Sequence, residues 1–291
     1  MTRPKTKFFW IGLGLYGLLA FFLFTLYRLP ADKVLGKALT LGTQTQTRVS
    51  AETVSFSLPL SYALEKILFE AQWPQGVSKD RIDSLRFGPE WSRILSGSFP
   101  LRIEAVSARA RAEAGLGLPF LGQGYFYARA STSHLEDISF MEVVLGRSVS
   151  GKGEAEVRLL GDVRFPSGLN GRGFLRITDG SVESKLPLAG LRSIPFQSFS
   201  ANLVVQEGVL YLSDGELAGP AVSGTFSGQV KLDNIMSRSV LNITALLTPG
   251  RMLDENDMAR RMLASLAPDG GPIPVHLRGT FGSPSIRWGK E

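Results

Sequence analysis

The sequence predicts a mainly β protein: one N-terminal transmembrane helix followed by a curled, elongated antiparallel β-sheet domain with a few short helices packed on it. Three observations support this class. An uncharged apolar stretch lies near the start, stretches of alternating apolar and polar residues recur after it, and the regular strand–helix alternation of a parallel sheet is missing. The alternation also predicts that one face of the sheet is polar and faces water.

The apolar stretch extends from Phe8 to Tyr27 and carries no charge. A helix of this length spans about 30 Å, which is the hydrocarbon thickness of a bilayer. Basic residues before it resemble a secretory signal, but the stretch is longer than a signal core and its exit at 25–30 lacks a small-residue cleavage pattern. We therefore expect an uncleaved signal anchor. The residues assigned to the anchor are Phe8, Trp10, Leu15, Leu19, Phe22, Phe24 and Tyr27.

The anchor divides the chain into four expected parts. Residues 1–7 form a cytoplasmic tail, 8–29 the transmembrane anchor, 30–42 a juxtamembrane helix and 43–291 the β domain. Basic side chains are equally numerous on the two flanks of the anchor, so the orientation follows the usual behaviour of a single N-terminal anchor before a long domain. In a bacterium this places the anchor in the inner membrane and the β domain in the periplasm.

Alternating stretches predict the strands of this domain. They lie within 43–58, 82–87, 101–105, 124–130, 154–159, 175–178, 202–213, 229–233, 241–247, 275–277 and 286–288. The segment 202–213 contains two apolar runs separated by Glu207 and Gly208, which predicts a tight hairpin. Pairs of glycines, such as Gly151 and Gly153, stand near several of the expected strand starts and suggest a long meander of similar hairpins.

Four segments have the spacing of helices. Apolar residues three and four apart predict a helix over 60–72, where Leu64, Ile67 and Leu68 share a face. Shorter helices are expected over 89–95 and over 135–145, the latter with Ser133 as its N-cap. The last helix is expected over 251–266.

Composition narrows the function. The net charge is +6, from 32 basic and 26 acidic residues, and three of the basic residues precede the anchor, so the remainder is only mildly basic and does not favour nucleic-acid binding. The chain has no cysteine, which excludes disulfides and thiolate chemistry.

No motif predicts an enzyme. Residues 146–152 match G-x-x-x-x-G-K, but Gly153 follows where a P-loop has Ser or Thr, and a strand rather than a helix is expected next. The glycines at 12, 14 and 17 follow no strand, so they do not indicate a dinucleotide site. His134 stands beside two acids and His276 on the polar side of a strand, without further metal-ligating residues. We expect no catalytic residue, cofactor or metal.

A family resemblance emerges from three segments. The anchor is followed at once by Arg28-Leu-Pro30-Ala-Asp-Lys-Val-Leu35, and late in the chain stand the segments 222–232 and 275–287. These resemble the N component of bacterial type II secretion systems and, more broadly, the AsmA-like group. The residues that match the pattern are Arg28, Pro30, Gly224, Gly228, Gly279, Thr280 and Pro284. We expect Gly279, Thr280 and Pro284 to lie at the turn and edge of the last strands.

The resemblance implies a non-catalytic secretion component and leaves two hypotheses. The first is a scaffold that contacts inner-membrane platform proteins, with the outer-membrane secretin as a further candidate partner. The alternative is an AsmA-like lipid-binding or lipid-transfer protein with an apolar groove in its curled sheet. The inner face of the sheet discriminates between them, because a filled interior favours the scaffold and a continuous apolar surface favours lipid.

Overall fold

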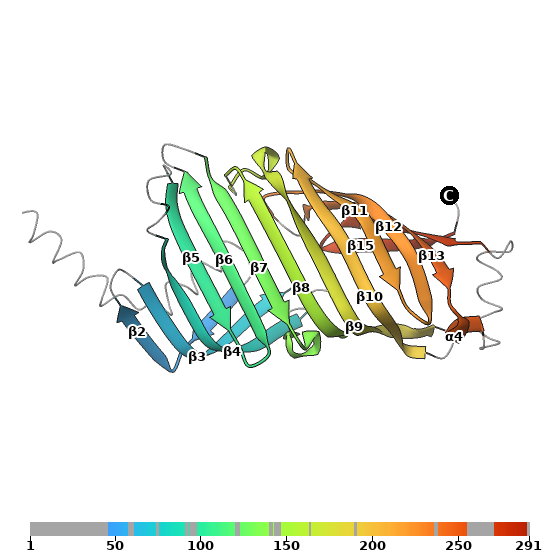
Figure 1. Ribbon diagram of the computed structural model, residues 1–291, viewed down its shortest axis with the longest axis horizontal. Helices are drawn as coiled ribbons and strands as arrows, with labels where there is room; N and C mark the ends of the chain where they lie inside the picture. Colours follow the sequence, from blue (N-terminus) through green and yellow to red (C-terminus); the bar gives the residue numbers. More distant parts are fainter. Residues whose placement is uncertain are drawn as a thin grey trace, which may run out of the picture.

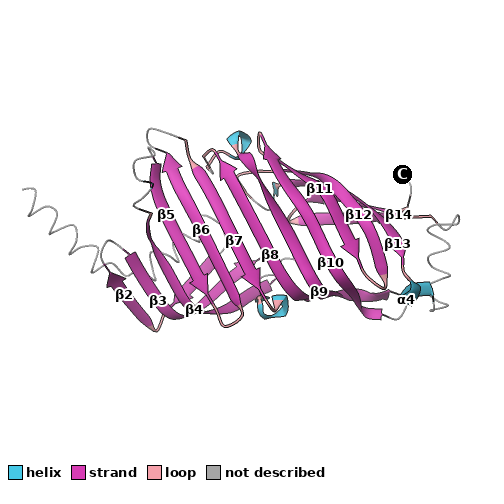
Figure 2. Ribbon diagram, viewed as in Figure 1, coloured by secondary structure: helices cyan, strands magenta, loops and turns pink. Residues whose placement is uncertain are grey.

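Alternating side chains build one antiparallel sheet of 15 strands (Figure 2). The computed structural model describes residues 46–57, 61–73, 76–90, 93, 98–119, 123–139, 142, 147–162, 164–188, 191–235, 238–254 and 271–289. The strands are β1 (Gln46–Ser50), β2 (Thr53–Ser57), β3 (Ser61–Trp73), β4 (Gly76–Pro89), β5 (Ser98–Val106), β6 (Ala110–Pro119), β7 (Tyr125–Thr132), β8 (Val149–Leu160), β9 (Asn170–Leu188), β10 (Leu191–Gln206), β11 (Val209–Ala218), β12 (Val222–Lys231), β13 (Val240–Pro249), β14 (Ile273–Thr280) and β15 (Ser283–Trp288).

The sheet is a meander in which sequence neighbours pair. From β3 to β15 each strand pairs with the next, while β1 and β2 both pair with β3, along different parts of its length. The predicted hairpin at Glu207 and Gly208 is present, and both residues have positive φ, 49° and 76°, as a two-residue hairpin turn with matching twist requires. The expected mainly β, antiparallel class is therefore confirmed.

Helices are few in the part of the chain described above. Those whose bounds the structure gives are the 3₁₀ turns η2 (Leu135–Asp137) and η3 (Pro166–Gly168) and the short helix α4 (Arg251–Asp254); Arg93, Ser139 and Glu142 are also helical. None of the helices in these ranges has the length and apolar character needed to cross a membrane. The expected anchor at 8–29, the juxtamembrane helix at 30–42 and most of the helix expected over 89–95 lie outside the described residues, as do residues 255–270 of the last expected helix.

Register places a continuous set of apolar side chains on one face of the sheet. Directly paired residues of neighbouring antiparallel strands share a face. One row of paired residues crosses the sheet from β5 to β15: Ile103, Ala114, Ala128, Val157, Gly173, Leu203, Leu212, Gly228, Ile243, Leu277 and Ile286. We call the side of the sheet that carries this row the apolar face and the opposite side, which begins with Arg102, Gly115 and Tyr127, the polar face.

Backbone switches keep the apolar face continuous where strands bend. Lys66, Asp179 and Asp214 have φ between 50° and 52°, the left-handed region. On β3 the buried residues are Tyr62 and Leu64 before Lys66, but Ile67 and Ala71 after it, so the strand changes which alternate residues face inward. Asp179 in β9 and Asp214 in β11 stand at similar changes of phase.

The sheet curls around its apolar face at the N-terminal end. The far half of β4 leaves its neighbour β5 and reaches the connection between β7 and β8, where the Lys79 N–H donates to Ser139 Oγ at 2.9 Å and the Ser139 N–H donates to Asp80 Oδ1 at 2.7 Å. Figure 1 shows the ends of β3 and β4 passing behind β5 to β7. Three intervening strands are thereby bridged on the apolar side.

One helix prediction, one N-cap prediction and one glycine prediction are wrong. The expected helix over 60–72 is instead strand β3; the switch at Lys66 shifts the alternation by one residue and so imitates helical spacing. The segment 135–145 begins as a 3₁₀ turn and has helical residues at Ser139 and Glu142, but the Ser133 hydroxyl donates to the Arg109 carbonyl and does not cap it. Several glycines expected at strand starts, including Gly224 and Gly228, lie inside strands, and strand β6 was not expected at all.

Candidate functional site

The apolar face is a continuous surface that is only partly buried. Every residue of the row defined above is at least partly exposed, and the exposed fractions of its two ends, Ile103 and Ile286, are 36% and 51%. A second, parallel row is equally apolar: Leu101, Leu116, Phe126, Leu159, Gly171, Val205, Leu210, Val230, Leu241, Gly279 and Pro284. No charged side chain interrupts either row.

Three clusters cover parts of this face. At the N-terminal end Tyr62, Leu64, Ile67 and Leu85 are buried together, with Val49 from the curled edge packed against them. In the middle, Leu135 of η2 packs with Val149, Ile177 and Phe196. Near the other end, Leu253 of α4 packs on Ala221. Outside these clusters the first row stays partly exposed, whereas Val205, Val230 and Leu241 of the second row are buried.

The glycines of the family pattern lie on the apolar face of β12 and β14. A Cβ added at Gly224 would clash with the Leu246 carbonyl oxygen, and one at Gly228 with that of Asn242, so the neighbouring backbone approaches too closely for a side chain. Gly279 pairs with Pro284 and Thr280 with Ser283, next to the turn between the last two strands. The other pattern residues, Arg28 and Pro30, and all the assigned anchor residues lie outside the described part of the chain.

The polar face carries an ionic network over β5 to β7. Arg102 lies 2.7 Å from Glu104 and 3.1 Å from Glu113, and the Tyr127 hydroxyl donates to Glu113 at 3.1 Å. Burial, followed by the hydrogen bond to Glu113, raises the pKa of Tyr127 to about 12. Arg93 stacks over the Tyr127 ring at 5.8 Å, so the connection after β4 is held down on this face.

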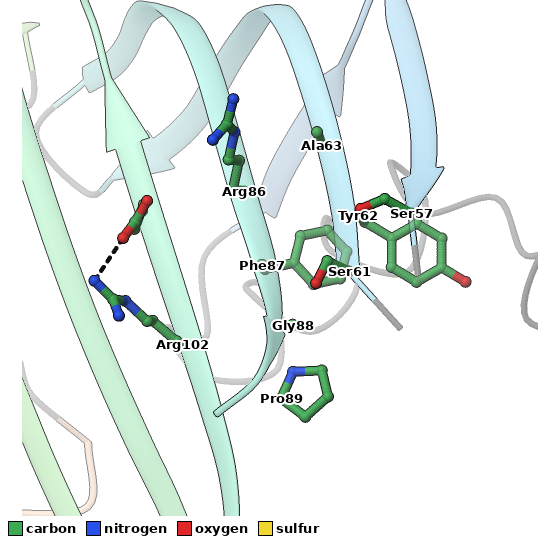
Figure 3. A pocket seen from close by; sticks show the side chains of 10 residues that line it. Ser57, Ser61, Tyr62, Ala63, Arg86, Phe87, Gly88, Pro89 and Arg102 are labelled. Atoms are coloured by element: carbon green, nitrogen blue, oxygen red, sulfur yellow. Dashed lines mark ion pairs between the residues drawn. The ribbon is translucent and has the colours of Figure 1, made fainter. Parts of the chain in front are cut away.

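A pocket of about 510 Å³ lies beside this network, at the rim formed by the ends of β2, β3 and β4. Its polar lining comes from Ser57, Ser61, Arg86, Arg102 and Glu104, and Figure 3 shows these side chains with the ion pair of Arg102. Sequence reasoning missed this pocket. The alternation of Arg86 with Leu85 and Phe87 in the sequence indicates that Arg86 lies on the polar face. It does not indicate that the ends of β2, β3 and β4 meet beside this residue.

The other residues considered as site candidates take part in local structural contacts. Gly151 has φ +128° at a bulge in β8, and Lys152 lies 3.1 Å from Asp179, so the G-x-x-x-x-G-K segment ends in a strand as expected. His134 Nδ1 lies 2.9 Å from Glu136, whose pKa is lowered by its own backbone N–H, by His134 and by the Gly151 N–H. His276 Nδ1 lies 3.2 Å from Thr244 Oγ1. In the described ranges, His, Asp and Glu form no group of three that could hold a metal ion.

The described residues therefore offer a long apolar surface with a polar rim pocket. No protein-family model, no curated protein and no solved structure matches this chain.

Proposed function

We propose that this protein binds lipid, with acyl chains resting on the apolar face of its curled sheet. The observation that carries the proposal is the uninterrupted, partly exposed apolar row from β5 to β15. Leaving such a surface in water costs about 25 cal/mol for each Å² of apolar area, and hydrocarbon removes this cost without requiring specific polar partners. A curled sheet also surrounds a chain from more than one side.

The dimensions suit acyl chains. Strands lie about 4.8 Å apart, so the row from β5 to β15 is about 50 Å long, whereas the hydrocarbon core of a complete bilayer is about 30 Å thick. Two acyl chains laid end to end therefore fit along it. We place the protein in a bacterial inner membrane, tethered through residues 8–29, with the sheet in the periplasm, where it would receive lipid from the adjacent bilayer.

Mass spectrometry of lipid retained by the full-length protein in mild detergent tests this proposal. Ile243→Asp puts a charge in the middle of the apolar face, and Asn242→Asp puts the same charge on the polar face of the same strand. We expect Ile243→Asp to lower retained lipid at least fivefold and Asn242→Asp to leave it unchanged, with both variants melting cooperatively. Absence of lipid from the wild-type protein, or equal retention by the two variants, contradicts the proposal.

We also propose a scaffold role in type II secretion, for which the free edge of the sheet provides support. All six residues of β15 are exposed, and in the described part of the chain it pairs with β14 alone. Such an edge can receive a strand from a partner. The periplasmic domain is expected to recover secretion-system components from an envelope extract. Recovery of none, together with normal secretion after deletion of the gene, contradicts this second role.

A further inference from the structure

The rim pocket contains an arginine that its neighbours leave uncompensated. Arg86 stands directly opposite Glu104 in the register of β4 and β5. Glu104, however, forms an ion pair with Arg102 at 2.7 Å, and Arg102 forms a second ion pair with Glu113 at 3.1 Å. Across the described ranges Arg86 has no ion pair or side-chain hydrogen bond. The carboxylates of Glu104 and Glu113 are thus already engaged with Arg102, and one guanidinium with its donors remains available in the pocket.

Two hydroxyl groups line the same pocket. Neither the Ser57 nor the Ser61 hydroxyl makes a side-chain hydrogen bond within the part of the chain that the structure describes. Gly88 lies opposite Ser61, and a Cβ at Gly88 would come within 2.9 Å of Ser61 Oγ, so the glycine leaves this hydroxyl its space. The pocket's volume, about 510 Å³, exceeds that needed by an inorganic ion and suits a small esterified group.

We propose that this pocket binds a phosphate ester, with Arg86 as the charge partner and Ser57 and Ser61 as hydroxyl donors. Arginine suits phosphate because its planar guanidinium donates two parallel hydrogen bonds to one anion. The three donor residues, Arg86, Ser57 and Ser61, lie on the polar face of their strands.

The site's position relates it to the proposed lipid function, on which this part of the inference rests. The strand ends at Ser57, Ser61 and Pro89 form a rim where the two faces meet. Beneath the pocket, Tyr62 and Phe87 stack with centroids 5.1 Å apart and belong to the apolar face. Phe87 in turn pairs with Ile103, which is 36% exposed on the apolar face, so a lipid with its phosphate beside Arg86 has accessible apolar surface within reach of its acyl chains. A free phosphate ester would use the same donors without that surface.

The test compares matched ligands with the full-length protein in mild detergent. Retention of phosphatidylglycerol and of a diacylglycerol with the same acyl chains is measured by native mass spectrometry, and binding of glycerol 3-phosphate by calorimetry. We expect Arg86→Gln to weaken phosphatidylglycerol binding about tenfold and to leave diacylglycerol binding unchanged. Arg172→Gln, an exposed arginine on the polar face of β9, is the control that should alter neither.

Each outcome decides a separate point. In one outcome, Arg86→Gln abolishes binding of glycerol 3-phosphate, and the wild-type protein retains the two lipids equally. This result supports the phosphate site and assigns it to a free phosphate ester. Unchanged binding of all phosphate ligands by Arg86→Gln overturns the site, even if both lipids are still retained and the lipid function stands. If Ile243→Asp loses diacylglycerol and Arg86→Gln retains it, the apolar face binds the acyl chains and Arg86 contributes only to binding of the phosphate.

Discussion

The two ends of the sheet use the same alternating pattern but finish differently. At the N-terminal end Leu64 and Ile67 are 0% and 1% exposed, beneath a curl that hydrogen bonds to Ser139 hold in place. At the C-terminal end every residue of β15 is exposed, and Ile286 and Trp288, on the apolar face, are 51% and 48% exposed. The N-terminal end is thus a packed core, and the C-terminal end is an open surface.

The difference comes from the backbone rather than from hydrophobicity. Lys66 adopts a left-handed conformation in β3, so the second half of that strand turns different residues inward and can fold back over the apolar face. No non-glycine residue in the described parts of β12 to β15 has positive φ. These strands keep a constant phase up to the free edge at β15. Stability is therefore expected to concentrate at the first end, whereas the proposed acyl-chain contact extends along the more exposed part of the face toward the second.

The largest expected effect contrasts two isoleucines. Ile67→Ala removes a buried side chain from the packed end, and we expect a loss of about 2–5 kcal/mol in the free energy of unfolding, because a cavity remains. Ile286→Ala removes half-exposed surface at the open end and should cost less than about 1 kcal/mol. Urea unfolding of the full chain, followed by circular dichroism, measures both. Equal losses would show that the ends are equally packed.

Next in size is the opening of the curl. Asp80→Ala leaves the Ser139 N–H without its acceptor and should cost about 1–3 kcal/mol. Hydrogen exchange of the amides in 76–82 should accelerate as this edge detaches, making the N-terminal end resemble the C-terminal one. Asp83→Ala, an exposed position on the same strand, is the control. Unchanged exchange in Asp80→Ala would mean that packing alone closes the curl.

A smaller effect is expected at the backbone switch. Lys66→Val places a β-branched residue at φ 50° and should be about 1–2 kcal/mol less stable than Lys66→Gly, which tolerates that conformation. Both variants lose the ion pair with Glu52, so this contribution cancels. Lys231→Val, in a strand of constant phase at the other end, should change thermal stability little. Equal stability of the Lys66→Val and Lys66→Gly proteins would show that the left-handed conformation at residue 66 imposes no cost on a β-branched side chain.

The smallest effect concerns Tyr127, on the polar face beside the N-terminal end. Its pKa is raised to about 12, so between pH 10 and 12 the unfolded chain has lost this proton while the native state retains it. Stability from this group is therefore complete below about pH 10 and falls as the pH rises, by no more than about 1 kcal/mol once solvent screening is allowed for. Tyr127→Phe should flatten this part of the stability profile; an unaltered slope would assign it to other groups.

Local pattern determined most of the strands and the polarity of the two faces. Alternation in stretches such as 154–159 and 241–247 places apolar side chains on one side wherever the backbone is regular, and Glu207-Gly208 encodes its own turn. These features depend on neighbours in sequence, so one chain is enough to predict them.

Only the tertiary structure decided β3, the curl and the rim pocket. At Lys66 a non-glycine residue adopts φ 50°, and the burial of Ile67 with Tyr62, Leu64 and Leu85 accompanies it. The resulting change of phase made a strand resemble a helix in sequence. Arg86 likewise has an ordinary place in an alternating strand, and it is left uncompensated only because Glu104 and Glu113 both meet Arg102 in the folded sheet.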